Sequence, residues 1–406
     1  HWIINPSVLE QKLDNKYLKD ILQKTVSPFK SLDSKVNAIR NFKRKEMLRI
    51  GLKDIYLKED LKNITLYLSS LANAISSILF ELCYKEILDK HNVEKTTRKY
   101  VLFALGKLGG NELNYSSDID LIAFYDKNSL VNKKIYYSQI LSETILLFIE
   151  TSSRKTGAGF LYRVDFRLRP DGRNAPLCGS YAEYIRYYET RGEDWERQML
   201  IKANYLCGSE SLYLKFSDSV SRFIYPATFS VSPIEQIRKL KSSIELRNKS
   251  DENIKLVSGG IRDIEFSIQA LQLLNGGKNL EIRTGNSLDA IDKLLKKNIL
   301  SEEEALTFND AYNFYRKAEH YLQLMNDLQT HKIPAEGEIA EKLANFLKFK
   351  DLKSFKEQLN EHKKKVQAIY NSIVGIVNTS DEKNDFEKVT FSDFKTAFLK
   401  KIFSTF

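Results

Sequence analysis

The sequence has few of the residues and motifs that several common enzyme classes require. Its three cysteines are far apart and odd in number, so they provide neither a disulfide framework nor the spacing of zinc ligands. Its five histidines are scattered, and no Gly-x-x-x-x-Gly-Lys-Ser/Thr, Cys-x-x-Cys or His-Glu-x-x-His motif occurs. These absences argue against a P-loop enzyme and a zinc enzyme, and the cysteine usage predicts a reducing, cytoplasmic location.

The sequence also has no uninterrupted membrane-spanning run. The nearest candidate extends from Ile64 to Cys83, but it is interrupted by Ser69, Ser70, Asn73, Ser76, Ser77 and Glu81. We therefore interpret this run as a buried amphipathic helix and expect no membrane partner. No basic-then-apolar signal peptide opens the chain and residue 1 is His, so we expect the sequence to be a fragment.

What is present is enough apolar sequence for two or three domains, since 42% of the 406 residues are hydrophobic. The net charge of +10 comes from lysines mixed with acidic residues, so we expect a solvated surface and no nucleic-acid partner. The patterns predict four segments: an N-terminal helical region at 1–92, a core with strands at 93–205, a helical bundle at 206–378, and a linker or start of a further domain at 379–406.

The stretch 109–121 carries the clearest chemical signal. It follows the short apolar run 101–105 and contains a Gly-Gly turn and then Asp118 and Asp120 at a second strand-like run. Because side chains alternate between the faces of a strand, both carboxylates are predicted to project to the same side. Two adjacent carboxylates repel each other unless a cation lies between them, so the pair predicts a site for a hard divalent ion such as Mg2+.

A further strand-like segment extends from Phe160 to Arg169. Here apolar residues alternate with Arg163, Asp165, Arg167 and Arg169, which predicts a strand with one apolar face and one face carrying an acid among three arginines. Asp165 would complete a three-carboxylate site, and the arginines would pair with carboxylates or meet phosphate oxygens. The alternative is an edge strand with a solvated network of salt bridges.

These features together predict phosphoryl or nucleotidyl transfer. The turn at Gly109 and Gly110 would let backbone amides approach a phosphate closely, and Ser116 and Ser117 would add hydroxyl groups beside it. Carboxylate-bound metal ions would neutralise phosphate charge and align the attacking and leaving oxygens.

Helical patterns dominate the rest of the chain. Two predicted capping boxes, Ser180 with Glu183 and Ser301 with Glu304, mark helix starts. Apolar spacing predicts one long helix from 301 to before Pro334 and another near 352–376. An apolar pattern resumes at 391–406 but is too short to fold alone.

The motifs, taken as a set, resemble one family. They are similar to those of glutamine synthetase adenylyltransferase/adenylyl-removing enzymes in the segments 104–110, 114–122, 162–173, 194–198 and 255–266. That family has two similar halves and this chain carries one such signature, so it resembles one half. Segment 326–334 and the residues before Gly259 look more like the N-terminal, adenylyl-removing half. Ser258 departs from the pattern, which has a glycine or alanine near this position.

The resemblance implies an α+β fold, mostly α, in which a polymerase-beta-type nucleotidyltransferase core with a small mixed β-sheet is embedded in helical domains. It implies that Asp118, Asp120 and Asp165 are catalytic and hold Mg2+ or Mn2+ while inorganic phosphate removes an adenylyl group from a tyrosine of glutamine synthetase as ADP. The candidates for contacts to substrate and phosphate are Gly109, Gly110, Ser117, Lys107, Arg167, Arg169, Arg173 and Lys202.

The partners that the resemblance implies are glutamine synthetase, a PII-type signal protein, ADP or ATP, and inorganic phosphate. Two alternatives stay open. The first is adenylyl transfer from ATP, because both halves of the family share the same carboxylates. The second is a non-catalytic PII-binding module, against which the three intact carboxylates argue.

Overall fold

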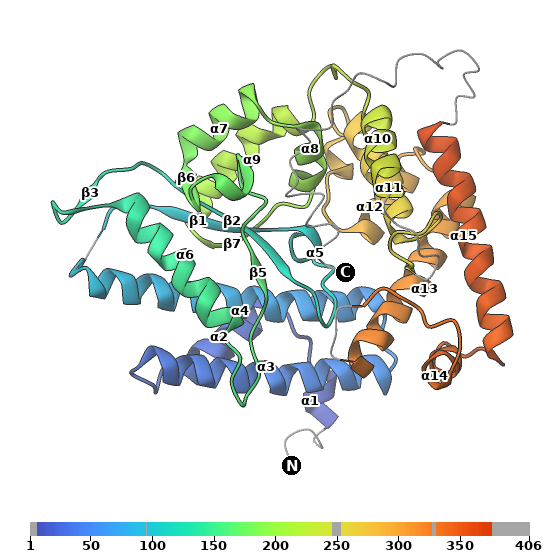
Figure 1. Ribbon diagram of the computed structural model, residues 1–406, viewed down its shortest axis with the longest axis horizontal. Coiled ribbons are helices and arrows are strands. Elements are labelled where there is room, and N and C mark those ends of the chain that lie inside the picture. The colour runs from blue at the N-terminus through green and yellow to red at the C-terminus, as the bar shows by residue number, and fades with distance from the viewer. Residues whose placement is uncertain (1–5, 95, 246–252, 327–329, 376–406) are drawn as a thin grey trace. The chain divides into compact units, whose positions relative to one another are not determined.

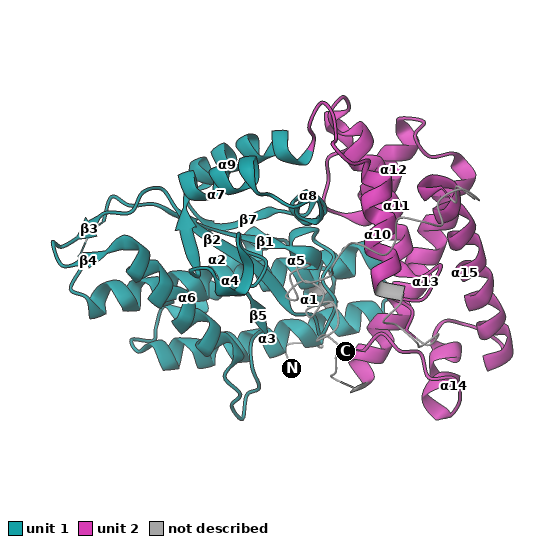
Figure 2. Cartoon of the chain, turned by 45° about the horizontal axis from the view of Figure 1, so that its top comes forward, with its two compact units in different colours: residues 1–224 teal, residues 225–406 magenta. Residues whose placement is uncertain are grey.

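The computed structural model describes residues 6–94, 96–245, 253–326 and 330–375. The chain divides into two compact units, residues 1–224 and 225–406 (Figure 2). The first unit contains the β-sheet, and the described part of the second is built from helices. The family-like residues 327–329 and the apolar pattern at 391–406 lie outside the described residues.

A small mixed sheet forms the centre of the first unit (Figure 1). Strand β1 pairs antiparallel with β2 on one side and with β7 on the other, whereas β5 and β6 both pair parallel with β2. The bounds are Tyr100–Leu105 for β1, Ile119–Tyr125 for β2, Val164–Asp165 for β5, Cys178–Ser180 for β6 and Asn204–Gly208 for β7. A separate hairpin joins β3 (Leu130–Val131) and β4 (Ile135–Tyr136). The expected small mixed sheet is confirmed.

Helices cover both faces of this sheet (Figure 1). Helices α4 (Leu61–Lys90) and α6 (Tyr137–Ser153) pack on the face that carries Leu102, and α7 (Tyr181–Thr190) and α9 (Glu210–Ile224) cover the other. On that second face the rings of Phe103 and Phe124 lie 5.4 and 4.8 Å from the ring of Phe216, centroid to centroid. Because both faces are buried, β1 and β2 are continuous apolar runs in the sequence.

The helices before the sheet are α1 (Pro6–Glu10), α2 (Asn15–Val26), α3 (Leu32–Ile55) and α4. By length and composition α4 could cross a membrane, but 83% of its apolar window is buried inside the protein. Two of its serines bond inside the unit: Ser77 Oγ donates to the carbonyl of Leu206, and Ser69 Oγ accepts the N–H of Leu113, each at 3.0 Å. The prediction of a buried helix is confirmed.

The segment 160–169 corrects one prediction. A single strand across this whole segment is wrong, because only Val164 and Asp165 pair with β2. The chain then turns, and Arg169 is buried with its guanidinium donating to the carbonyl oxygens of Phe166, Arg173, Ala175 and Pro176 at 2.6–3.2 Å. These bonds organise the loop 166–176, which takes the place of the expected strand.

The described helices of the second unit surround their own apolar core. They are α10 (Pro233–Glu245), α11 (Ile261–Asn275), α12 (Ser287–Lys296), α13 (Glu302–Asn326), α14 (Glu338–Phe346) and α15 (Leu352–Val374). At the start of α13 the backbone N–H of Ser301 donates to Glu304 at 2.9 Å and that of Glu304 donates to Ser301 Oγ at 3.2 Å. Ser180 and Glu183 cap α7 in the same reciprocal way, so both predicted capping boxes are confirmed.

Candidate functional site

The predicted aspartates lie at or beside the start of β2. Asp120 lies in register with Asp165 on the neighbouring parallel strand β5, and Asp118 directly precedes β2. Residues paired across parallel strands project from the same face, with their strands about 4.8 Å apart. The sheet register therefore places the carboxylates of Asp120 and Asp165 side by side.

Two arginines bind the carboxylates of Asp118 and Asp165. Arg163 Nε donates to Asp118, and its Nη2 donates to the carbonyl of Ser116 at 2.9 Å. Arg167 donates to Asp165 from its backbone N–H at 2.7 Å and from Nε at 2.8 Å. The hydrogen bond to Asp165 raises the pKa of Arg167 against the opposing effect of burial, and the charges of Asp165 and Asp118 add to the rise. Arg167 therefore lies within electrostatic reach of both carboxylates.

Gly106 leaves room for the side chain of Asp120. Gly106 opens the short helix α5 (Gly106–Gly109) with a left-handed φ of +56°, and a Cβ here would lie 2.6 Å from Asp120 Oδ2. Only glycine, which has no Cβ, leaves room here for the carboxylate of Asp120. At Gly109 a Cβ would instead lie 1.9 Å from the backbone oxygen of Lys202, and Gly110 donates its N–H to the carbonyl of Gly106 at 3.0 Å.

Two of the predicted phosphate contacts are engaged inside the fold. Lys202 is 8% exposed and forms an ion pair with the buried Glu112, and Arg169 is 6% exposed within its loop. Two other candidates are more accessible, whereas Gly109 and Gly110 are buried. Lys107 follows Gly106 and is half-buried, and Arg173 is exposed in a short 3-10 helix.

Ser117 and the motif 255–266 have local roles. Ser117 Oγ accepts the backbone N–H of Asn114 at 3.3 Å, within the turn before β2. In the second unit, buried Asp263 accepts hydrogen bonds at 2.7 Å from Lys241 Nζ and from the N–H of Gly259. This motif therefore joins α10 to the start of α11.

The paired aspartates fit a divalent cation of the Mg2+ type. Carboxylate oxygens are the ligands that this ion prefers, and one or two carboxylates are usual when substrate phosphates and water complete its shell. Within the described ranges, no group of three or more His, Cys, Asp or Glu side chains is arranged to hold a metal. Asp118 contacts Arg163 instead. Asp120 and Asp165 are thus the two residues that the fold presents together, and a three-carboxylate metal site stays a prediction.

Two residues of this site, Gly106 and Arg163, have roles that depend on the fold. Gly106 follows the apolar run 101–105, and a glycine at the junction of a strand and a motif is a signal for a left-handed turn. The sequence leaves open whether Arg163 pairs with a carboxylate or meets phosphate oxygens, and its contact with Asp118 depends on the pairing of β5 with β2. That pairing has no local signature in the sequence.

Comparisons with known proteins agree with this architecture. The model of the family described as glutamate-ammonia ligase adenylyltransferase matches residues 2–219, more than half of the chain. The model described as GlnD PII-uridylyltransferase matches residues 235–374, within the second unit.

Curated relatives carry the corresponding name, bifunctional glutamine synthetase adenylyltransferase/adenylyl-removing enzyme. The relative from Vibrio parahaemolyticus is 33% identical over 348 residues, which are 83% of this chain and 37% of the relative. The relative from Psychromonas ingrahamii is 32% identical over 394 residues, which are 92% of this chain and 41% of the relative. The chain thus spans about two fifths of the length of these relatives. The resemblance seen in the motifs is confirmed, and the chain belongs to the glutamate-ammonia ligase adenylyltransferase family.

Proposed function

We propose that this chain removes adenylyl groups from a tyrosine of glutamine synthetase by phosphorolysis. The observation that carries the proposal is the register of Asp120 with Asp165, beside a glycine that leaves room for the carboxylate. Paired carboxylates at a strand end suit a reaction in which negative charge moves between phosphate oxygens. The name of the relatives, which includes an adenylyl-removing activity, supports this direction.

An oxygen of inorganic phosphate forms a bond to the adenylyl phosphorus, the bond from that phosphorus to the tyrosine oxygen breaks, and ADP leaves. The tyrosine oxygen then takes up a proton. Phosphate is already an anion, so it needs orientation by cations more than it needs a strong base.

The residues of the site divide this work. Asp120 and Asp165 would hold Mg2+ or Mn2+, which when bound supplies positive charge at the phosphoryl oxygens. Arg167 keeps Asp165 in place and, with a side chain 28% exposed, also offers donors toward solvent. Lys107 follows the Gly106 turn, so we assign it and Arg167 the contacts to phosphate, whereas Arg169 and Lys202 shape the fold.

Adenylyl transfer from ATP is the second candidate. The matching family model is described as an adenylyltransferase, and the same two carboxylates would serve the transfer. For partners, the match of residues 235–374 to a PII-uridylyltransferase supports a PII-type protein as a partner of the second unit. We place all of these activities in the cytoplasm.

The decisive assay uses glutamine synthetase that carries a radiolabelled adenylyl group. The chain is incubated with this substrate, inorganic phosphate and Mg2+, and labelled ADP is separated and counted. Asp120→Asn and Asp165→Asn are expected to lower the rate by roughly 100-fold or more. Asp126→Asn is the matched control, because Asp126 follows the other end of β2, where it accepts the N–H of Lys99 at 3.1 Å.

The outcomes separate the candidates. Metal-dependent ADP formation that is lost in Asp120→Asn and kept in Asp126→Asn supports phosphorolysis. Transfer of label from ATP to unmodified synthetase, without ADP formation from phosphate, supports the second candidate. Activity that survives both Asp120→Asn and Asp165→Asn refutes the site, and binding of a PII-type protein without either reaction supports a docking module.

A further inference from the structure

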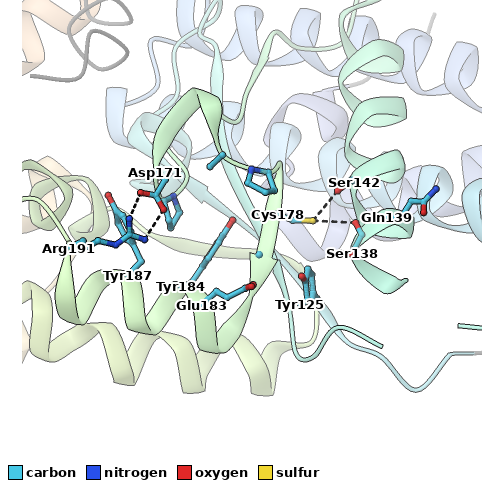
Figure 3. Close-up of a pocket in the computed structure, with 14 residues that line it drawn as sticks. Tyr125, Ser138, Gln139, Ser142, Asp171, Cys178, Glu183, Tyr184, Tyr187 and Arg191 are labelled. Carbon is cyan, nitrogen blue, oxygen red and sulfur yellow. Dashed lines mark hydrogen bonds and ion pairs between the residues drawn. The ribbon is translucent and has the colours of Figure 1, made fainter. Parts of the chain in front are cut away.

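The two ends of strand β2 are supported in different ways. Its last residues pair with β6, beside a cavity of about 580 Å³ (Figure 3). The charged side chains in the lining of this cavity are engaged with the protein itself, since Arg191 donates to both oxygens of Asp171 and Glu183 caps α7. At its other end β2 continues from the turn 111–118, which lies outside the sheet and ends at Asp118. We call these residues the entry turn.

Asp118 needs support that the sheet does not give. It lies outside the register that places Asp120 beside Asp165. Arg163 binds its carboxylate, but Arg163 itself belongs to the loop before β5. The position of Asp118 therefore depends on how the entry turn is held against the rest of the first unit.

Tyr115 ties the entry turn to helix α3. Its hydroxyl donates to Asp54 Oδ2 at 2.8 Å, and Asp54 lies in the last turn of α3. Burial raises the pKa of Tyr115, and the charge of Asp54 and the hydrogen bond to it add to the rise, so the hydroxyl stays protonated and keeps donating. A hydrogen bond to a charged group is stronger than one between neutral groups. The bond therefore gives the entry turn a firm contact outside the sheet.

Helix α3 also contacts the segment that leads into β5. Lys43 Nζ donates to the carbonyl of Leu161 and lies 4.4 Å from the centroid of the Tyr162 ring. Asp54 is about 16 Å further along the helix, at 1.5 Å per residue. One continuous helix thus contacts the segments that precede both strands with a paired aspartate.

We propose that Asp54 is a positioning residue, which acts through Tyr115 to keep the entry turn and Asp118 in the geometry that the reaction requires. The proposal rests on the proposed function, because it concerns the carboxylates assigned to that reaction. Groups that orient the residues around a metal site contribute about 10- to 100-fold to metal affinity or activity. Since Arg163 still binds Asp118 when the Tyr115 bond is lost, we expect an effect at the lower end, about tenfold.

The first test compares two bonds of the same chemistry. Tyr115→Phe removes the hydroxyl that donates to Asp54. Tyr67→Phe is the matched control, because the Tyr67 hydroxyl donates to Glu59 at 2.7 Å and neither residue belongs to the entry turn. Both variants should lose similar stability in urea unfolding.

Three further measurements should distinguish the two variants. Only Tyr115→Phe should speed hydrogen exchange of the peptide 111–119 in metal-free buffer, because only there is the entry turn released. Only Tyr115→Phe should weaken Mn2+ binding and lower the rate of ADP formation, each about tenfold. The KM for adenylylated synthetase should stay unchanged, since the bond makes no contact with that protein in the proposal.

The second test asks whether Asp54 acts through Tyr115. Asp54→Asn keeps an oxygen that accepts from the hydroxyl and should keep most of the wild-type rate, whereas Asp54→Ala should lose about tenfold. In the double variant of Asp54→Ala with Tyr115→Phe, the loss should stay near that of either single variant, because both changes remove the same bond.

The outcomes separate this proposal from the proposed function. If the wild type forms no ADP while Tyr115→Phe changes hydrogen exchange and Mn2+ affinity, the proposed function fails and the positioning role holds. If the wild type forms ADP and Tyr115→Phe keeps its rate and its Mn2+ affinity, the positioning role fails and the proposed function stands. Unchanged exchange of 111–119 in Tyr115→Phe, equal losses in Tyr67→Phe, or additive losses in the double variant would each overturn the positioning role.

Discussion

The substitution Gly106→Ala tests whether the glycine turn positions the Asp120 carboxylate for the proposed reaction. Two costs are expected. The left-handed φ of +56° is unfavourable for alanine by roughly 1–2 kcal/mol. In addition, the new Cβ would meet Asp120 Oδ2 at 2.6 Å, where ordinary contacts begin at 3.4 Å, so the oxygen must withdraw by about 0.8 Å.

That displacement is large on the scale of metal coordination. Ligand distances hold to about 0.2 Å, and a misplacement of about 1 Å in an active site costs roughly 100-fold in rate. We therefore expect Gly106→Ala to lower the phosphorolysis rate by about 100-fold while the protein stays folded. Its affinity for Mn2+, measured by electron paramagnetic resonance, should fall in parallel.

Gly159→Ala supplies the matched control. Gly159 also has a positive φ, +86°, but a Cβ there meets nothing within 4 Å. Urea unfolding should show a similar loss of stability in both variants, whereas only Gly106→Ala should lose activity and Mn2+ affinity. Two results would show that the contact with Asp120 does not govern the proposed reaction. One is wild-type activity in Gly106→Ala, and the other is a loss of activity in Gly159→Ala as large as that in Gly106→Ala.

Three further predictions concern stability and reactivity. Lys202→Met should lower the free energy of unfolding by about 3–5 kcal/mol, because it leaves the charge of Glu112 buried; the double variant with Glu112→Leu should recover part of this loss in urea unfolding. Burial raises the pKa of Glu143, but hydrogen bonds from Lys90 and His91 outweigh it and lower that pKa to about 2. The folded pKa is depressed, so Glu143→Gln should destabilise the protein above about pH 4.5 and make little difference near pH 2 in thermal melts. A thiol reagent at pH 8 should label the cysteines only after unfolding, because burial raises their pKa, to about 12 at Cys83, to about 11 at Cys178, and also at Cys207.

The sequence predicts those elements whose signal is local. The runs 101–105 and 119–125 are apolar, short and bounded by polar or glycine residues, and both are strands. The capping pairs Ser180 with Glu183 and Ser301 with Glu304 mark helix starts because each pair bonds within one turn. Same-face placement of Asp120 and Asp165 also follows from simple alternation once their strands pair.

What the sequence misses depends on distant partners. The alternation at 160–169 imitates a strand, but the chain turns after Asp165, and Arg169 holds that turn by donating to the carbonyl oxygens of Phe166, Ala175 and Pro176. The sequence does not distinguish a buried arginine such as Arg169 from a surface arginine, whereas the fold does. Lys202 is a similar case, because its partner Glu112 lies in a different part of the chain.

The enclosed helix α4 has a consequence for how this protein is made. Its neighbours include α2 and α3, which precede it, but also α6 and β7, which are synthesised later. At roughly 5–20 residues per second, the ribosome needs on the order of ten seconds to proceed from α4 to β7. During that time α4, which has the composition of a membrane span, can pack against α2 and α3 but not yet against α6 and β7. The nascent chain is therefore expected to depend on chaperones that shield apolar helices until the sheet is complete.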